Sequence, residues 1–199
     1  MPETTGERSA LRSPAAWARF LAAIVVAAGV DLATKEWANY ALGNSATAWP
    51  AERAAALQRW LLCLDLVWQA NPGAVFGSWA GKTAPLIAFT LLALGLLTWL
   101  FTDSRRDQRW LHLFLSFIMA GAIGNLYDRL AFHHVRDFLR INLRTDWATW
   151  GGPDHYLWPY IFNVADVFIT VGVFGLFVIW IAALFKRGHE KAGGPASGS

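Results

Sequence analysis

The sequence is poor in several residue types on which whole classes of function depend. It has one cysteine, Cys63, so a disulfide within the chain is excluded. Its five histidines form no HExxH motif and no other pair at metal-ligand spacing, which argues against zinc hydrolysis. It also lacks GxSxG and SxxK motifs for serine chemistry and Walker or Rossmann glycine motifs for nucleotides.

Charge is also scarce. Asp, Glu, Lys and Arg make up 16% of the 199 residues, whereas an average soluble domain carries about 25%. The formal net charge is only +3, and no basic cluster interleaved with aromatic residues indicates a nucleic-acid partner. Hydrophobic residues reach 55%, with 12 Trp, and the mean hydropathy is +0.33. This composition indicates a membrane protein.

Four stretches are long and apolar enough to cross about 30 Å of hydrocarbon as helices. They cover approximately residues 17–42, 84–101, 110–130 and 161–185. We predict that residues 1–199 form one all-α membrane domain with four transmembrane helices. The first stretch has an alternative as a cleaved signal peptide, because Arg12 and Arg19 precede its apolar run. Against this, the helical pattern continues through Asp31 and Lys35 to Leu42.

Positive residues near the ends of these stretches predict the orientation. They lie in the N-terminal segment, in the loop between the second and third stretches, and in the tail: Arg8, Arg12, Arg19, Arg105, Arg106, Arg109, Lys186, Arg187 and Lys191. In a four-span topology these segments share one side, which the positive-inside rule makes cytoplasmic. Both termini are therefore predicted to be cytoplasmic, and the two long loops, about 43–83 and 131–160, to lie outside.

The outer loops predict a small extracytoplasmic β element and a surface helix. The segment "PAERAAALQRW", residues 50–60, suits an amphipathic helix on the bilayer surface or an ordinary packed surface helix. Period-two patterns at 62–69 and 139–144 are typical of half-buried strands. The small and polar tail, residues 188–199, is predicted to be disordered.

Polar residues embedded near the span ends all fall on the outer side in this topology. They are Asp31 and Lys35 in the first span, Asn125, Asp128 and Arg129 in the third, and Asn163 and Asp166 in the fourth. Ionisable residues at membrane depth are costly and mark functional sites by default. We infer one polar site at the outer membrane boundary.

Three of these charged residues are expected to have structural roles. Asp31 and Lys35 are four residues apart, so they share a helix face and are expected to form a salt bridge. Asp128 is expected to pair with the adjacent Arg129. A paired carboxylate is a poor general base, so we assign Asp128 to scaffolding.

Asp137 and Asp166 are the candidates for acid and base chemistry. Asp137 follows the third span in "HHVRDFL", and Asp166 lies in the first turn of the fourth. If the two carboxylates meet, their repulsion splits their titration. One can then act as a base on water while the other donates to a scissile carbonyl. The alternative is two independently solvated carboxylates at the interface.

Four short motifs occur along the chain in the order "DLATK", "NPGAVFG", "GAIGNLYDR" followed by "DF", and "FNVAD". Together they resemble the lipoprotein signal peptidase (signal peptidase II) family, the intramembrane aspartyl proteases of bacteria. The resemblance covers Asp31 to Asp166 and the span beyond. The chain departs from the family pattern at Pro72, at His133, where glycine is usual, and at Arg136, where an apolar residue is usual. The segment between the two aspartates is also longer than typical.

The resemblance implies an aspartyl endopeptidase that removes the signal peptide from diacylglyceryl-modified prolipoproteins. An activated water would cleave before the lipidated cysteine, so no metal or cofactor is needed. The catalytic pair would be Asp137 and Asp166. Substrate-binding or supporting roles are implied for Asn71, Gly73, Asn125, Arg129, Asn163, Asp31, Lys35 and Asp128.

The same resemblance implies a location and partners. The enzyme would be a monomer in the bacterial inner membrane, with its site on the outer side among membrane phospholipids. Globomycin-type inhibitors would be expected to occupy the catalytic pair.

Two other functions are weighed against this one. A proton-coupled transporter would use Asp31, Asp128 and Asp166 as a relay, and it predicts polar residues spread across the bilayer, whereas here they cluster at one face. A non-enzymatic scaffold of the same fold predicts that replacing either Asp137 or Asp166 leaves prolipoprotein processing unchanged.

Overall fold

Four long apolar helices dominate the computed structural model, which describes residues 9–43, 63–73, 83–143 and 158–192. They are α1 (Pro14–Ala38), α3 (Thr83–Asp103), α4 (Arg109–Phe132) and α5 (Val164–Ala192). A π-helical turn, η2 (Asn39–Gly43), extends α1. Each of the four is long and apolar enough to cross a membrane. The predicted four-span, all-α architecture is confirmed.

Local signals explain where two of these helices begin and end. Ser13 caps α1 by accepting a hydrogen bond from the backbone N–H of Ala16 at 3.2 Å, and Pro14 occupies the first helical position. α4 ends where His133 adopts the left-handed conformation, with φ of 63°. This conformation favours glycine, and here a histidine reverses the chain direction toward the sheet.

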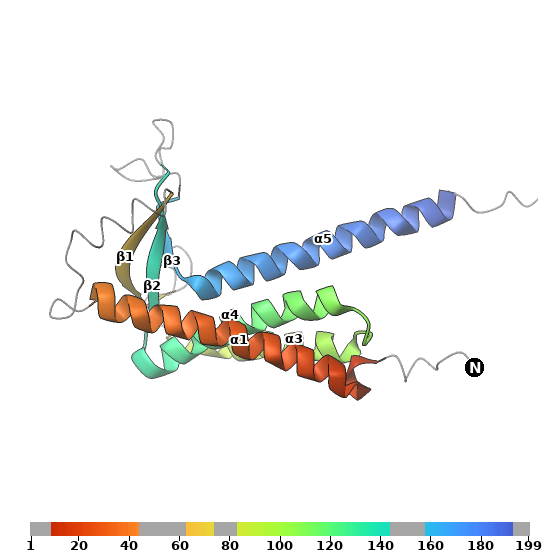
Figure 1. Cartoon of the computed structure of the whole chain (residues 1–199), viewed down its shortest axis with the longest axis horizontal. Helices are drawn as coiled ribbons and strands as arrows, with labels where there is room; N and C mark the ends of the chain where they lie inside the picture. Colours follow the sequence, from red (N-terminus) through yellow and green to blue (C-terminus); the bar gives the residue numbers. More distant parts are fainter. Residues whose placement is uncertain (1–8, 44–62, 74–82, 144–157, 193–199) are drawn as a thin grey trace, which may run out of the picture.

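α4 is the central helix and packs against α1, α3 and α5. In Figure 1, α1, α3 and α4 run side by side, and a small sheet lies at the end of the bundle where α1 finishes. α5 starts beside this sheet and diverges from the other helices toward its C-terminal end. At the opposite end, η1 (Ala10–Arg12) is tied to the α3–α4 turn by the Ala10 N–H, which donates to the Ser104 carbonyl at 2.9 Å.

The sheet has three antiparallel strands in the order β1 (Leu64–Asn71), β2 (Val135–Ile141) and β3 (Ile161–Phe162). Gln69 of β1 lies opposite Asp137 of β2. The predicted small β element is confirmed, with two differences. β2 begins before the predicted alternation at 139–144, so it includes Asp137. Residues 161–162, predicted to open the fourth helix, form β3 instead, because the helix starts only after Asn163.

The C-terminal helix also extends further than the sequence predicts. α5 continues through Ala192, so the prediction of disorder is wrong for residues 188–192. The Glu, Lys and Ala residues of this segment are good helix formers, and they propagate a helix already formed in the apolar span. Residues 193–199 lie outside the described residues, as does the predicted surface helix at 50–60.

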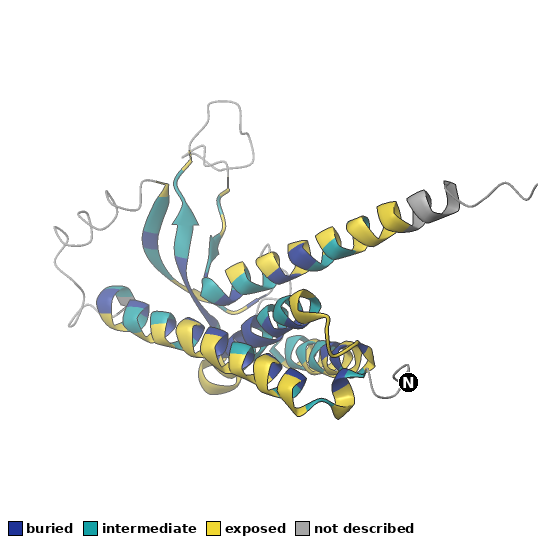
Figure 2. Ribbon diagram, turned by 45° about the vertical axis from the view of Figure 1, so that its right-hand side comes forward, coloured by how far each residue is buried: buried dark blue, intermediate teal, exposed yellow. Residues whose placement is uncertain are grey.

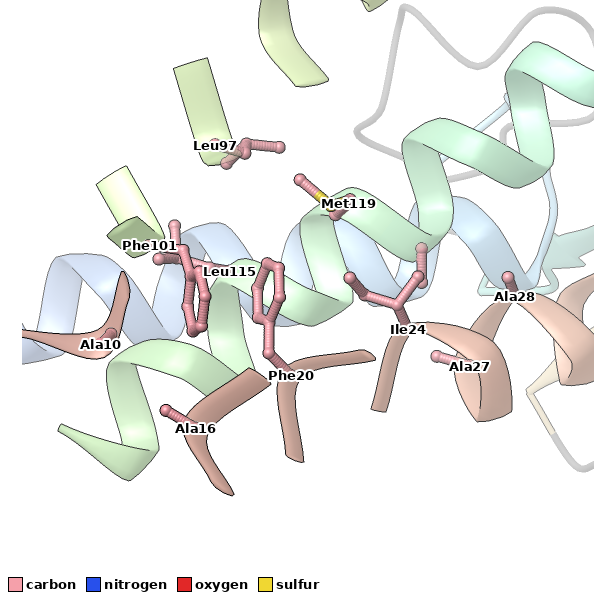
Figure 3. Packing of buried hydrophobic residues seen from close by; sticks show 11 residues of the cluster. Ala10, Ala16, Phe20, Ile24, Ala27, Ala28, Leu97, Phe101, Leu115 and Met119 are labelled. Atoms are coloured by element: carbon pink, nitrogen blue, oxygen red, sulfur yellow. The ribbon is translucent and has the colours of Figure 1, made fainter. Parts of the chain in front are cut away.

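An apolar core fills the half of the bundle away from the sheet (Figure 3). The rings of Phe20 in α1 and Phe101 in α3 stack at a centroid distance of 4.0 Å, and Leu115 of α4 packs against the same cluster. The outward faces of the helices are exposed (Figure 2). The exposed residues include large apolar ones such as Phe89 and Phe174. Such faces are suited to lipid.

Two glycines allow the helices to approach closely at the other half of the bundle. A Cβ atom at Gly124 of α4 would overlap the Asp31 carboxylate of α1. A Cβ at Gly121 would overlap the Ala165 carbonyl of α5. Small residues in the "GAIG" segment thus bring both neighbouring helices against α4.

We predict that Gly124→Ala destabilises the protein by about 1–3 kcal/mol, because the added methyl group overpacks a buried contact. Gly95→Ala is the matched control, because a Cβ at Gly95 meets no atom within 4 Å. The control should be neutral or slightly stabilising, since alanine is the better helix former. Thermal unfolding of the purified proteins in detergent compares the two, and equal midpoints would contradict the prediction.

Candidate active site

Asp137 and Asp166 approach the same point from a strand and a helix. Asp137 lies in β2, and Asp166 lies in the first turn of α5. Asn163 links them, because its side-chain Nδ2 donates to Asp137 Oδ1 at 2.7 Å and its backbone N–H donates to Asp166 Oδ2 at 3.1 Å. In return, the Asp166 N–H donates to Asn163 Oδ1 at 3.1 Å. This reciprocal pattern is a capping box, so the start of α5 also fixes the Asp166 carboxylate.

Two more asparagine amides hold these carboxylates. Asn71 of β1 donates from Nδ2 to Asp137 Oδ2 at 2.9 Å, while its own Oδ1 accepts from the Gly73 N–H at 3.0 Å. Asn125 of α4 donates from Nδ2 to Asp166 Oδ1 at 3.0 Å. Each amide is itself oriented by a further bond, which leaves the two carboxylates in a defined geometry.

The environment of Asp137 changes its acidity. Its side chain is 2% exposed. Burial raises the pKa of Asp137 to about 7, repulsion from Asp166 adds to the rise, and the hydrogen bond from Asn71 opposes it. A carboxyl group with a pKa near neutrality can both give and take a proton under physiological conditions.

A buried ionic cluster supports this site from the side of α1. Lys35 Nζ lies 2.9 Å from Asp31 Oδ2 and 3.4 Å from Asp128 Oδ2, and all three side chains are fully buried. Lys35 also donates to Asn125 Oδ1 at 2.8 Å. Asp31 Oδ1 accepts from the Ala165 N–H at 2.8 Å, which satisfies one free donor at the start of α5. The predicted Asp31–Lys35 salt bridge is confirmed.

The predicted pairing of Asp128 with Arg129 is wrong. Asp128 Oδ1 instead accepts from Arg136 Nη2 at 2.8 Å, and Arg129 donates from Nη1 to the Asn125 carbonyl at 3.2 Å. Adjacent helical residues do not face each other, so neighbours in sequence point to different surroundings. Because Asp31 and Asp128 are committed to these cations, the geometry disfavours the proton relay of a transporter.

Arg129 lines an open pocket of about 490 Å3 between α3 and α4. Its lining consists of Thr83, Ala84, Pro85, Ile87, Arg129, Leu130 and His133. The charges of Asp166, Asp137 and Asp128 all act on the Arg129 guanidinium.

Among the residues that the structure describes, no group of three His, Cys, Asp or Glu side chains is arranged to hold a metal ion.

Comparison with known proteins identifies the family. A model of the family described as signal peptidase (SPase) II matches residues 22–183. The chain belongs to the signal peptidase II family.

Curated relatives and a solved structure agree with this family. The lipoprotein signal peptidase of Bartonella tribocorum is 30% identical over 179 residues, which cover 86% of this chain and 94% of that protein. Its counterpart in Clostridium novyi is 37% identical over 102 residues, or 51% of this chain, and the match spans 62% of that relative. A solved bacterial membrane enzyme has the same fold, with a TM-score of 0.61, 24% identity and coverage of 90% of this chain and 93% of that one. The signal peptidase II chain is a multi-pass membrane protein.

The structure of this signal peptidase II chain brings the predicted site residues together at the sheet end of the bundle. These are Asp137, Asp166, Asn71, Gly73, Asn125, Arg129, Asn163, Asp31, Lys35 and Asp128. Two contributors were missed by sequence reasoning. Arg136 was noted as a departure from the family pattern, but its contacts with Asp128 and Glu36 were not foreseen, and Glu36 was not noted at all. A lone glutamate near a helix end carries no signal that a distant arginine will bind it.

The raised pKa of Asp137 predicts a pH dependence of stability. Between about pH 4 and about pH 7 the folded protein keeps a proton that the unfolded chain has lost. The contribution of Asp137 therefore weakens the folded state as pH rises through this window. Asp137→Asn cannot ionise, so its stability relative to the parent should increase from about pH 4 to about pH 7 and then level off.

Thermal unfolding of the parent and Asp137→Asn across this range measures the difference. Asp107→Asn is the control, because the Asp107 side chain is 62% exposed and pairs with Arg105 away from the site. A difference between Asp137→Asn and the parent that is independent of pH would contradict the assigned pKa.

Proposed function

We propose that this chain is an aspartyl endopeptidase that removes the signal peptide from diacylglyceryl-modified prolipoproteins, cleaving before the lipidated cysteine. The family and the curated names of its relatives support the substrate class. The single observation that carries the mechanism is the linkage of Asp137 and Asp166 through Asn163, with the pKa of Asp137 raised to about 7 by burial.

The two carboxylates take different roles in the proposed reaction. Asp166 accepts N–H donors from Asn125 and Asn163 and acts as the base on water. The water oxygen attacks the scissile carbonyl carbon, and its proton passes to Asp166. Protonated Asp137 donates to the carbonyl oxygen as charge develops there. When the tetrahedral intermediate collapses, Asp166 gives its proton to the leaving amine and Asp137 recovers its own.

The remaining site residues bind or support in this proposal. Asn71, Gly73 and Arg129 lie at the edge of the carboxylate pair, where an extended substrate segment would contact them. Asn125, Asn163, Asp31, Lys35 and Asp128 keep the pair in position. Water is the nucleophile, so the proposed reaction requires no metal or cofactor.

The proposed setting uses the orientation predicted from the positively charged residues near the span ends. The enzyme acts as a monomer in the bacterial inner membrane, with both termini cytoplasmic and the carboxylate pair at the outer boundary. Its substrate enters laterally among the phospholipids, and membrane anchoring of both partners raises the local concentration and restricts orientation. Globomycin-type inhibitors would compete for the carboxylate pair.

Cleavage of a purified diacylglyceryl-modified prolipoprotein in liposomes tests this function. We expect the parent to cleave, and Asp137→Asn and Asp166→Asn each to lose about 10²–10⁴-fold in rate, because each removes one proton-transfer group. Asp107→Asn should cleave at the parental rate, and a chelator should have no effect.

Two results would sink the proposal. One is a well-folded parent that does not cleave, which would leave a scaffold with the family fold. The other is cleavage that survives both Asp137→Asn and Asp166→Asn, since catalysis would then lie elsewhere.

A further inference from the structure

The arginine that precedes Asp137 connects β2 to two helices. The side chain of Arg136 is 4% exposed. Arg136 donates from Nε and Nη2 to Asp128 Oδ1 at 3.2 and 2.8 Å, and from Nη1 to Glu36 Oε2 at 2.8 Å. Its backbone N–H also donates to Asp128 Oδ2 at 3.0 Å. One residue of β2 is thus tied to α4 through both its backbone and its side chain, and to α1 through its side chain.

Phe138, on the other side of Asp137, has a related attachment. It is 2% exposed and packs in a cluster with Ala38 and Leu66. Its ring lies edge-on to Trp37 with a centroid distance of 6.5 Å. Because side chains alternate along a strand, Arg136 and Phe138 share the face toward the end of α1. Asp137 points to the other face, toward Asn71 and Asn163.

β2 needs such an attachment at this point. β3 pairs with it only at Leu139 and Arg140, so within the described residues Asp137 has a strand neighbour on the β1 side alone. A strand segment that is paired on one side only is held by fewer hydrogen bonds than a segment paired on both sides. The contacts of Arg136 supply the second restraint.

Compensation of the Asp128 charge does not by itself account for this arrangement. Lys35 already lies 3.4 Å from Asp128. Arg136 reaches beyond Asp128 to Glu36, whose side chain is 69% exposed and needs no cation for its solvation. The extra contact adds little to the charge balance, but it fixes the guanidinium between α1 and α4.

We propose that Arg136 is a positioning residue for catalysis: it clamps β2 between α1 and α4 and so holds Asp137 against Asn163 and beside Asp166. The inference rests on the proposed peptidase function. Loss of the clamp should affect the chemical step, since small displacements of a reacting group cost large factors in rate. Substrate binding depends on other residues and should change little.

Steady-state cleavage by Arg136→Leu, Arg136→Lys and the matched control Arg140→Leu tests the clamp. Arg140 lies on the same strand and pairs with Asp65 at 2.8 Å, on the part of the sheet beyond Asp137. We expect Arg136→Leu to lower kcat by about tenfold or more, with KM within about twofold of the parent. Arg136→Lys should retain an intermediate kcat, because an ammonium cannot reproduce the fork that joins two carboxylates. Arg140→Leu should keep kcat within about twofold of the parent.

Glu36→Gln provides a variant of the clamp that leaves the buried cluster intact. Because the Glu36 side chain is largely exposed, this protein should fold normally and show a smaller fall in kcat, about two- to threefold. If Arg136→Leu does not fold, Arg136→Lys and Glu36→Gln decide the matter. Parental kcat in both, an effect on KM alone, or an equal fall in Arg140→Leu would overturn the proposal.

A second readout does not depend on catalysis. The carboxyl 13C signal of Asp137 reports its pKa, which the hydrogen bonds from Asn71 and Asn163 lower. Arg136→Lys keeps the positive charge but loosens the strand, so this pKa should rise as those bonds weaken. An unchanged value in Arg136→Lys would overturn the clamp even if the parent proved not to be a peptidase. Conversely, if the parent does not cleave the substrate but the pKa of Asp137 still rises in Arg136→Lys, the clamp is supported and the proposed function fails.

Discussion

The buried carboxylate of Asp128 is the junction on which the arrangement of α1, α4 and β2 depends. It is fully buried and receives Lys35 from α1 and Arg136 from β2. Removing an ion from water costs several kcal/mol, and breaking a buried pair leaves a charge without compensation. The three elements therefore cannot separate or shift relative to one another without breaking these ion pairs. The cluster therefore fixes the relative positions of α1, α4 and β2, and it contributes less to the net stability of the fold.

The same cluster extends its order to the acidic pair. Lys35 donates to the Oδ1 atom of Asn125, which turns the amide so that its Nδ2 faces Asp166. Asp31 meanwhile satisfies the Ala165 N–H at the start of α5. The position of Asp166 is thus set twice, once by its own capping box with Asn163 and once by contacts that begin in α1. A continuous set of hydrogen bonds links buried charges to the groups proposed to move protons.

Much of the fold could be predicted from the sequence because hydrocarbon thickness fixes how long an apolar helix must be. The polar residues could be placed at one end of the bundle for a related reason, since the topology decides which helix ends lie together. The Asp31–Lys35 salt bridge could also be predicted, because residues four apart share a helix face. Strand β2 could be predicted only in part. Its alternation is hidden where the buried run of 135–138 contains both an arginine and an aspartate.

The ion pair between Asp128 and Arg136 shows why other contacts could not be predicted. The two residues are eight positions apart, and they meet only because the left-handed turn at His133 reverses the chain after α4. The sequence contains no periodicity from which that turn can be deduced, and Arg129 is the nearer cation in sequence. Glu36 was equally hidden, because its role depends on a strand one hundred residues away.

The contact between Gly124 and Asp31 has a consequence for the evolution of this chain. A side chain at position 124 would overlap the carboxylate at position 31, and that carboxylate in turn pairs with Lys35 and accepts a hydrogen bond at the start of α5. A substitution at either position therefore depends on which residue occupies the other. Shortening residue 31 would make room for a larger residue 124, but it would also remove one of the two carboxylates that lie beside Lys35. Either change alone disturbs the buried cluster around Lys35, so the effects of substitutions at the two positions are expected to be coupled.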